Sequence, residues 1–242
     1  MYFIFYIYVG ESVDTDFFYV IIRTLEDIWG VTMKNCVVFF DLFDTLIKVN
    51  RGYLEEYFDK ELDKLGDIGA IKDSVSTINE IVKKHPEVLD KHSVEDMTFY
   101  YEKVMRDSLM NVDLDVLNML KKLKEKGYKL CIISDATYVD IMHFKESPLA
   151  KYFDNKVFSC EYGVAKPDSK IYQIALDIMA NPSKTIFVGD GGHDELIGAK
   201  TNGMITIKVE WFKRNVKYDS VDYLCNVMDH LVRIIDKLDV NN

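Results

Sequence analysis

Residues 36–45 have the sequence CVVFFDLFDT, a short apolar run followed at once by an aspartate. An apolar run of this length, bounded by a polar residue, predicts a buried strand over Cys36–Phe40. The strand places Asp41 at its carboxyl end, where a carboxylate can be a nucleophile, a metal ligand or a helix cap. Taken alone, this stretch leaves a structural and a catalytic role for Asp41 equally open.

Beyond residue 112 the chain alternates between short apolar runs and segments with helical periodicity. Leucines recur at helical spacing over 114–126, a segment that starts beside Asp113 and stops at Gly127. Further strands are predicted over residues 129–134, 157–159, 185–188 and 204–209, and further helices over 171–179 and 221–238. Strands separated by helices predict the α/β class, with a doubly wound parallel sheet and right-handed crossovers.

Residues 50–112 interrupt this alternation, because they contain no convincing strand. Helical signals cover 53–65, 71–84 and 94–109. The segment follows Asp41 closely, so we expect it to form a small helical cap over the end of the sheet. The predicted domains are therefore an α/β core from 33–49 and 113–242, and a helical cap from 50–112.

The first 32 residues precede this domain. They open with MYFIFYIYVG, which is shorter than the roughly 20 apolar residues of a membrane span and lacks the flanking pattern of a secretory signal. Because Met33 begins a run typical of a domain start, we expect residues 1–32 to be a start-site artefact. The alternatives are an added strand, an aromatic docking arm or an oligomer contact.

The overall charge limits the classes of partner. Thirty Lys and Arg oppose forty Asp and Glu, a formal charge of -10, which argues against a nucleic-acid surface but leaves a local pocket free to bind an anion. The four cysteines are widely separated and form no zinc-binding pattern. We expect a reduced, cytoplasmic protein, monomeric or homodimeric, that binds neither nucleic acid nor membrane.

Three polar residues lie at the carboxyl ends of predicted strands: Asp41, Ser134 and Asp190. In open parallel sheets the functional site lies outside these ends. We therefore expect the three side chains to meet at one edge of the sheet.

The segment GDGGHDELIGA at 189–199 gathers carboxylates around a glycine-rich loop. Asp190 follows a predicted strand, and Asp194 and Glu195 begin a predicted helix. Carboxylates close together repel one another unless a cation lies among them, and a hard oxygen site with few protein ligands suits Mg²⁺. The alternative is that Asp194 and Glu195 only favour the helix N-terminus electrostatically.

Groups that could bind an anion lie on two other loops. Lys166 lies between a predicted strand and a helix opened by Pro167 and Asp168. Ser134 offers a hydroxyl, and the Asp135 backbone N–H at an expected helix start could donate to phosphate. A nucleophile, a metal site and cationic charge are what phosphoryl transfer mostly requires.

The order of DLFDT at 41–45, IISD at 132–135, AKPD at 165–168 and VGDGGHDELIGA at 188–199 resembles the haloacid dehalogenase (HAD) superfamily, from Asp41 to about Glu210. The resemblance implies a Rossmann-like core with a helical cap inserted after the first strand. It implies Asp41 as the nucleophile that forms an aspartyl-phosphate, Ser134 and Lys166 as phosphoryl ligands, and Asp190 as a Mg²⁺ ligand. Glu195 falls where the family's second acid lies.

The first motif departs from the phosphatases of this family, which carry a general acid–base aspartate two residues after the nucleophile. Phe43 occupies that position here, and Asp44 follows it. A shift of one residue in extended chain turns a side chain to the opposite face, so Asp44 is a candidate rather than an equivalent. General acid–base catalysis of this kind raises the reaction rate by about 10²–10⁴-fold. The backbone carbonyl of Phe43 can still coordinate a metal.

Three functions follow from these residues. The first is a Mg²⁺-dependent phosphatase of a small phosphorylated metabolite, acting through Asp41. The second is a metal-independent 2-haloacid dehalogenase-like hydrolase, since that branch also lacks the second aspartate. The third is a catalytically weakened HAD binding protein, suggested by Phe43.

Overall fold

The computed structural model describes residues 34–50, 52–54, 74–212 and 221–240. Within them lies a six-stranded, all-parallel sheet with the strand order β3-β2-β1-β4-β5-β6. Its strands are β1 (Cys36–Phe40), β2 (Lys129–Ser134), β3 (Asn155–Phe158), β4 (Lys184–Gly189), β5 (Ile205–Val209) and β6 (Tyr223–Cys225). The predicted α/β class with a doubly wound parallel sheet is therefore confirmed.

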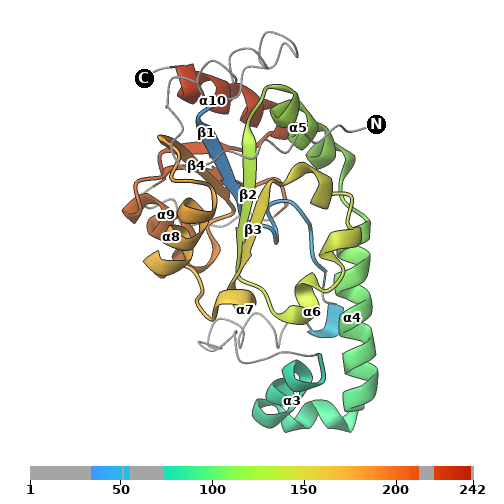
Figure 1. Cartoon of the computed structure of the whole chain (residues 1–242). Coiled ribbons are helices and arrows are strands. Elements are labelled where there is room, and N and C mark those ends of the chain that lie inside the picture. The colour runs from blue at the N-terminus through green and yellow to red at the C-terminus, as the bar shows by residue number, and fades with distance from the viewer. Residues whose placement is uncertain (1–33, 51, 55–73, 213–220, 241–242) are drawn as a thin grey trace, which may run out of the picture.

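Helices cover both faces of the sheet (Figure 1). They are α5 (Leu114–Glu125) and α10 (Met228–Val240) on one face, and α8 (Ser169–Ile178) and α9 (Glu195–Thr201) on the other. The core has two clusters: the first lies between the sheet and α5 and α10, and the second between the sheet and α8 and α9. Alternate residues of β1 face opposite clusters, since Val38 and Phe40 belong to the first, and Val37 and Phe39 to the second. Burial of β1 on both faces explains its continuous apolar sequence.

The inserted segment is mainly helical where the structure describes it between residues 52 and 110. It contains the short 3₁₀ turns η1 (Gly52–Leu54) and η4 (Pro86–Asp90) and the helices α3 (Ser74–Lys84) and α4 (Val94–Met110). Ser93 caps α4 by accepting a hydrogen bond from the Asp96 N–H at 3.0 Å. Figure 1 shows α3 at the end of α4 that lies away from the sheet. Most of the predicted helix over 53–65 lies outside the described residues, and the cap boundaries stay a prediction.

The prediction of one continuous helix over 221–238 is wrong. Residues 223–225 form the edge strand β6, and α10 begins only at Met228. The apolar run of β6, Tyr-Leu-Cys, has only three residues, which is too short to distinguish a strand from one turn of an amphipathic helix. The third strand also differs, since β3 ends at Phe158 and Ser159 opens the short helix α7 (Ser159–Tyr162).

The four cysteines are all buried, and none forms a disulfide. Residues 1–32, expected to be an artefact, lie outside the described residues. In the part of the chain that the structure describes, no helix has the length and apolar character needed to cross a membrane.

Candidate active site

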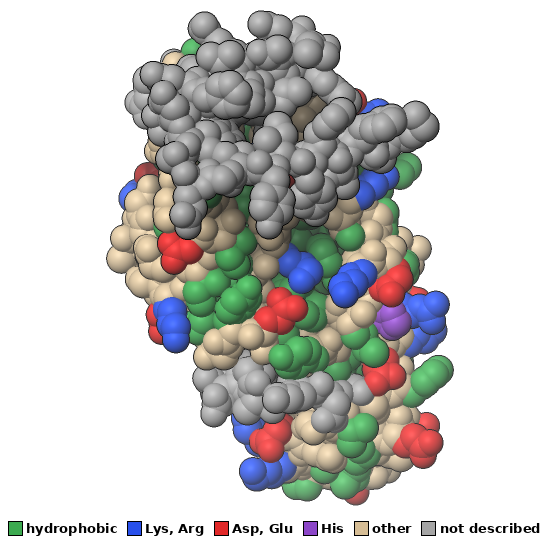
Figure 2. All heavy atoms as spheres, in the orientation of Figure 1, with side chains coloured by type: hydrophobic (Ala, Val, Ile, Leu, Met, Phe, Trp, Pro, Cys, Tyr) green, Lys and Arg blue, Asp and Glu red, His purple; other side chains and the backbone are tan. Residues whose placement is uncertain are grey.

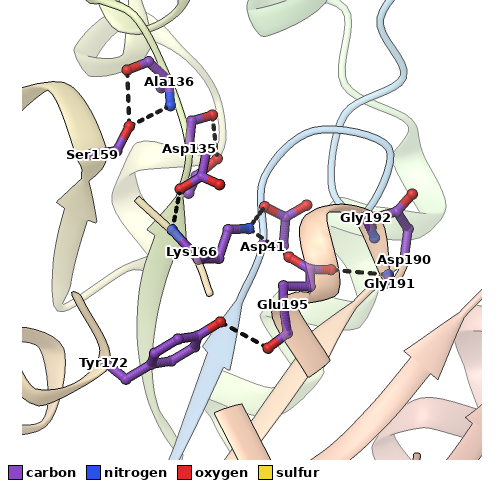
Figure 3. A network of polar contacts seen from close by, with 11 residues as sticks. Asp41, Asp135, Ala136, Ser159, Lys166, Tyr172, Asp190, Gly191, Gly192 and Glu195 are labelled. Carbon is purple, nitrogen blue, oxygen red and sulfur yellow. Dashed lines mark hydrogen bonds and ion pairs between the residues drawn. The ribbon is translucent and has the colours of Figure 1, made fainter. Parts of the chain in front are cut away.

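Three neighbouring strands deliver polar groups to one edge of the sheet. Asp41 directly follows β1, Ser134 ends β2 and Asp190 directly follows β4. Because β1 lies between β2 and β4, these residues emerge side by side at the carboxyl ends. Lys166 reaches the same place from the loop that precedes α8 (Figure 3).

Lys166 joins two of the acids. Its ammonium group donates to Asp41 Oδ1 at 2.6 Å and to Glu195 Oε2 at 2.5 Å, and its side chain is only 3% exposed. Burial alone would lower the pKa of Lys166, but the charges of Asp41 and Glu195 outweigh it and hold the pKa well above its usual value. Lys166 is therefore a fixed positive charge beside Asp41.

Asp41, Asp190 and Glu195 form a buried carboxylate group. Each offers an oxygen, and these oxygens lie within 4.8 Å of one another. Burial, and next the charge of Asp41, raise the pKa of Glu195 well above its usual value, although Lys166 opposes the shift. Three acids with one lysine leave excess negative charge. Because the donors are hard oxygens and few in number, the group fits Mg²⁺, which keeps several waters.

The glycine-rich loop shapes this group. Gly191 has a φ of +90° and its N–H donates to Glu195 Oε1 at 3.0 Å. The Gly192 N–H donates to Asp190 Oδ1 at 3.0 Å. A Cβ on Gly189 would lie only 2.1 Å from Glu195 Oε1, so the Glu195 carboxylate occupies space that only a glycine leaves open.

Asp194 does not join the carboxylate group. It is exposed and has a φ of +52°, whereas Glu195 is 1% exposed. The spacing left both residues as metal candidates, and the structure brings only Glu195 beside Asp41 and Asp190.

The loop after β2 carries Ser134 and Asp135. The Asp135 side chain accepts a hydrogen bond at Oδ1 from the Lys166 N–H at 2.9 Å. The expectation that Asp135 lies at a helix start is wrong, because α6 (Tyr138–Ile141) begins three residues later, capped by Thr137. Ser134 is fully buried, and its Oγ donates to the Asp135 carbonyl at 3.4 Å.

Phe43 and Asp44 form a tight turn after β1. Phe43 packs against the first core cluster, so its side chain is used in packing. Asp44 has a φ of +57°, and its N–H donates to the Ile47 carbonyl at 2.7 Å. The acid–base role of Asp44 and metal binding by the Phe43 carbonyl both stay predictions.

Tyr172 is a site residue that the sequence did not reveal. Its hydroxyl donates to the Glu195 carbonyl at 2.7 Å (Figure 3), which fixes the start of α9. A Cβ on Gly198 would lie 2.7 Å from this hydroxyl, so α8 and α9 approach closely here. Tyr172 lies within an apolar helical stripe, and no sequence signal distinguishes it from a core residue.

Comparison with known proteins gives a family match over this region. A sequence model of a family of hydrolases, the haloacid dehalogenase-like hydrolases, matches residues 37–203.

Curated relatives include phosphatases. Pyrophosphatase PpaX of Bacillus velezensis is 29% identical over 213 residues, covering 81% of this chain and 94% of the relative. Glyceraldehyde 3-phosphate phosphatase of Methanocaldococcus jannaschii is 26% identical over 223 residues, covering 83% and 97%. Bifunctional epoxide hydrolase 2 of Rattus norvegicus is 32% identical over 105 residues, covering 41% of this chain. That match spans only 19% of the rat protein.

Solved structures with the same fold include dehalogenases and a phosphatase. L-2-haloacid dehalogenase from Xanthobacter autotrophicus, with chloropropionic acid covalently bound, has a TM-score of 0.64 at 16% identity, covering 84% of this chain and 99% of the other. A HAD phosphatase from Thermococcus onnurineus has a TM-score of 0.55 at 22% identity, covering 84% and 98%. At these identities the likeness shows the fold alone.

Proposed function

The chain belongs to the haloacid dehalogenase-like hydrolases, and we propose that it is a Mg²⁺-dependent phosphatase of a small phosphorylated metabolite. The observation that carries the proposal is the buried group of Asp41, Asp190 and Glu195, whose oxygens lie within 4.8 Å of one another. One lysine, Lys166, contacts two of these acids. Such an excess of buried negative charge favours a bound cation.

Asp41 is the nucleophile in this proposal. Lys166 holds Oδ1, and the other carboxylate oxygen points away from the lysine (Figure 3). Asp41 attacks phosphorus, and the bond from phosphorus to the ester oxygen breaks. Water then attacks the aspartyl-phosphate, which releases inorganic phosphate and restores the carboxylate. Lys166 and the Ser134 hydroxyl bind phosphoryl oxygens in both steps.

Asp41, Asp190 and Glu195 would hold Mg²⁺, with the Phe43 carbonyl as a further candidate ligand. When bound, the ion neutralises negative charge on the phosphoryl oxygens. The glycine-rich loop positions two of these acids without side chains of its own, because the N–H groups of Gly191 and Gly192 bond their carboxylates.

The test is phosphate release from a panel of small phosphate esters, with Mg²⁺ and with EDTA, by wild type and Asp41→Asn. We expect release that requires Mg²⁺ and that is lost in the variant, because an amide cannot act as the nucleophile. Release that survives in Asp41→Asn would show that Asp41 is not the nucleophile.

A metal-independent dehalogenase is the second candidate, and Phe43 in the first motif favours it. Asp41 would then displace halide from a 2-haloacid. The acidic pair Asp190 and Glu195 has no evident use in that reaction, which is why we place it second. Halide release from 2-haloacids in EDTA would support it. Phosphate binding without turnover on any ester would instead support a binding protein.

The proposal also covers the cellular compartment and the class of ligand. We infer a cytoplasmic enzyme, because the four buried cysteines form no disulfide and reduced cysteines are usual in that compartment. The formal charge of -10 supports a small phosphorylated substrate over nucleic acid as the ligand.

A further inference from the structure

The candidate site needs a group that moves protons, because departure of an ester oxygen requires a proton when the leaving group is a simple alcohol. Phe43, at the position where phosphatases of the family carry an acid, is partly buried and packs against the core. Asp190 and Glu195 belong to the carboxylate group that would hold the cation. Asp44, next to Phe43, stays one candidate for this role, and a second candidate lies on another element.

Asp135 is an acid on the neighbouring strand end with one oxygen unused. Oδ1 accepts the Lys166 N–H at 2.9 Å. Oδ2 is buried, and within the described residues it has no hydrogen-bond partner. Figure 3 shows this carboxyl group beside Lys166, whose side chain leads on to Asp41. The two oxygens thus differ: Oδ1 fixes the side chain, and Oδ2 accepts no hydrogen bond from the described residues.

The surroundings of Oδ2 favour a protonated oxygen. A buried oxygen that accepts no hydrogen bond is costly as a carboxylate, and a negative charge here would repel a phosphoryl group. Burial, the largest influence, raises the pKa of Asp135, and Asp41 adds to the rise, while Lys166 and His193 oppose it. A protonated Oδ2 would instead donate a hydrogen bond to an ester oxygen.

We propose that Asp135 is the general acid and base of this enzyme, from the strand end next to Asp41, in place of the acid missing at Phe43. The assignment rests on the proposed phosphatase function. As Asp41 attacks phosphorus, the breaking bond leaves its electron pair on the ester oxygen, which takes the proton from Asp135 Oδ2 and departs as an alcohol. The Asp135 carboxylate then takes a proton from the water that attacks the aspartyl-phosphate, so the cycle ends with Asp135 protonated.

The test compares two esters in the variant Asp135→Asn. The amide keeps Oδ1 as acceptor for the Lys166 N–H and loses only the proton carrier. We expect kcat/KM on glycerol phosphate to fall about 10²–10⁴-fold. On 2,4-dinitrophenyl phosphate it should change little, because that leaving group needs no proton. Asp177→Asn, the same change at an exposed residue of α8, should leave both values unchanged.

Two further measurements separate this role from simple damage. The thermal shift produced by Mg²⁺ should be the same in wild type and Asp135→Asn, which reports an intact cation site. Asp135→Glu, which retains an ionisable oxygen, should recover part of the activity on glycerol phosphate that Asp135→Asn loses, and should leave kcat/KM on the dinitrophenyl ester close to the wild-type value.

The outcomes distinguish this assignment from the proposed function. If Asp135→Asn loses activity equally on both esters, or loses none, Asp135 is not the general acid and base. Mg²⁺-dependent phosphate release by wild type would still support the phosphatase function in that case. An ester-dependent loss in Asp44→Asn, with none in Asp135→Asn, gives the role to Asp44. Absence of any Mg²⁺-dependent phosphate release by wild type overturns both proposals.

Discussion

Glu195 shows how individual residues create the site. Its carboxylate accepts hydrogen bonds from Lys166 and from the Gly191 N–H, and it fills space left by the missing Cβ of Gly189. These contacts fix the buried carboxylate of Glu195 beside Asp41. If this group holds the proposed Mg²⁺, it would do so without first reorganising, which favours affinity.

The first prediction compares Glu195→Gln with Asp194→Asn, two adjacent acids in different surroundings. Glu195→Gln should weaken Mg²⁺ binding by more than the roughly 10- to 100-fold that loss of a supporting partner costs. Asp194→Asn, at an exposed position, should change it little. Titration of the thermal shift with Mg²⁺ measures both. An equal effect of the two changes would place the cation elsewhere.

The sequence predicts which residues belong to the candidate site better than it predicts how their side chains are placed. The spacing from Asp190 to Glu195 pointed to the acid that the structure places in the group, yet it could not exclude Asp194, because the turn depends on φ values of +53° and +52° at His193 and Asp194. The buried Oδ2 of Asp135 has no hydrogen-bond partner among the described residues. Its surroundings also depend on contacts between distant segments, which no local pattern encodes.

Among the strands, those formed by buried apolar runs are predictable from the sequence, whereas a strand held in place by polar contacts is not. β1 and β2 match their predicted bounds because they are buried. β6 is instead attached to the sheet through Asp222, the residue before it. Asp222 Oδ2 accepts hydrogen bonds from the Thr206 N–H and the Thr206 hydroxyl, both at 2.9 Å. Asp222 Oδ1 accepts a hydrogen bond from the Lys200 ammonium group at 2.6 Å. A polar clamp of this kind joins β6 to β5 and leaves no periodic signal.

The second prediction concerns this clamp. Burial raises the pKa of Asp222, but hydrogen bonds from Lys200 and Thr206 outweigh it and lower the pKa below its usual 3.8. The charged clamp therefore stabilises the fold above the usual range of aspartate and loses this effect as pH falls through the lower, folded-state pKa. Asp222→Ala should lower the free energy of unfolding by about 1–2 kcal/mol at neutral pH. The difference in stability between wild type and variant should become smaller in acid. Urea unfolding across pH measures it, and a difference independent of pH would contradict it.

Across the whole molecule, α4 connects the inserted helices to the site. Tyr101, fully buried on α4, donates to Asp140 Oδ1 and lies 3.4 Å from the Thr137 hydroxyl. Asp140 Oδ2 accepts the Thr137 N–H at 2.7 Å, in the turn that follows Asp135. The helical segment therefore contacts the same loop that carries Ser134 and Asp135, as the course of α4 past α6 in Figure 1 also shows.

The third prediction tests this connection. Tyr101→Phe removes a buried hydroxyl and leaves Asp140 with one fewer donor, so it should lower the free energy of unfolding by about 1–3 kcal/mol. Tyr100→Phe, a half-buried neighbour on the same helix, should cost clearly less. Urea denaturation of both variants measures the difference. Equal costs would show that the contact with Asp140 adds nothing.

The face of the molecule drawn in Figure 2 carries charges of both signs. Figure 2 shows acidic and basic side chains interspersed over the described part of this face, rather than a continuous basic patch. The excess of forty acidic over thirty basic residues therefore does not oppose a phosphorylated substrate, because Lys166 provides local positive charge at the site.

In the proposed reaction the phosphoryl group is transferred from the substrate to Asp41 and then to water. This can be tested by quenching the enzyme during turnover with Mg²⁺ and a phosphate ester and mapping the modified residue by mass spectrometry. We predict one phosphoryl group on Asp41, absent in EDTA and absent in Asp41→Asn. Turnover with no phosphoryl group on Asp41, or turnover that persists in Asp41→Asn, would show that Asp41 is not the nucleophile.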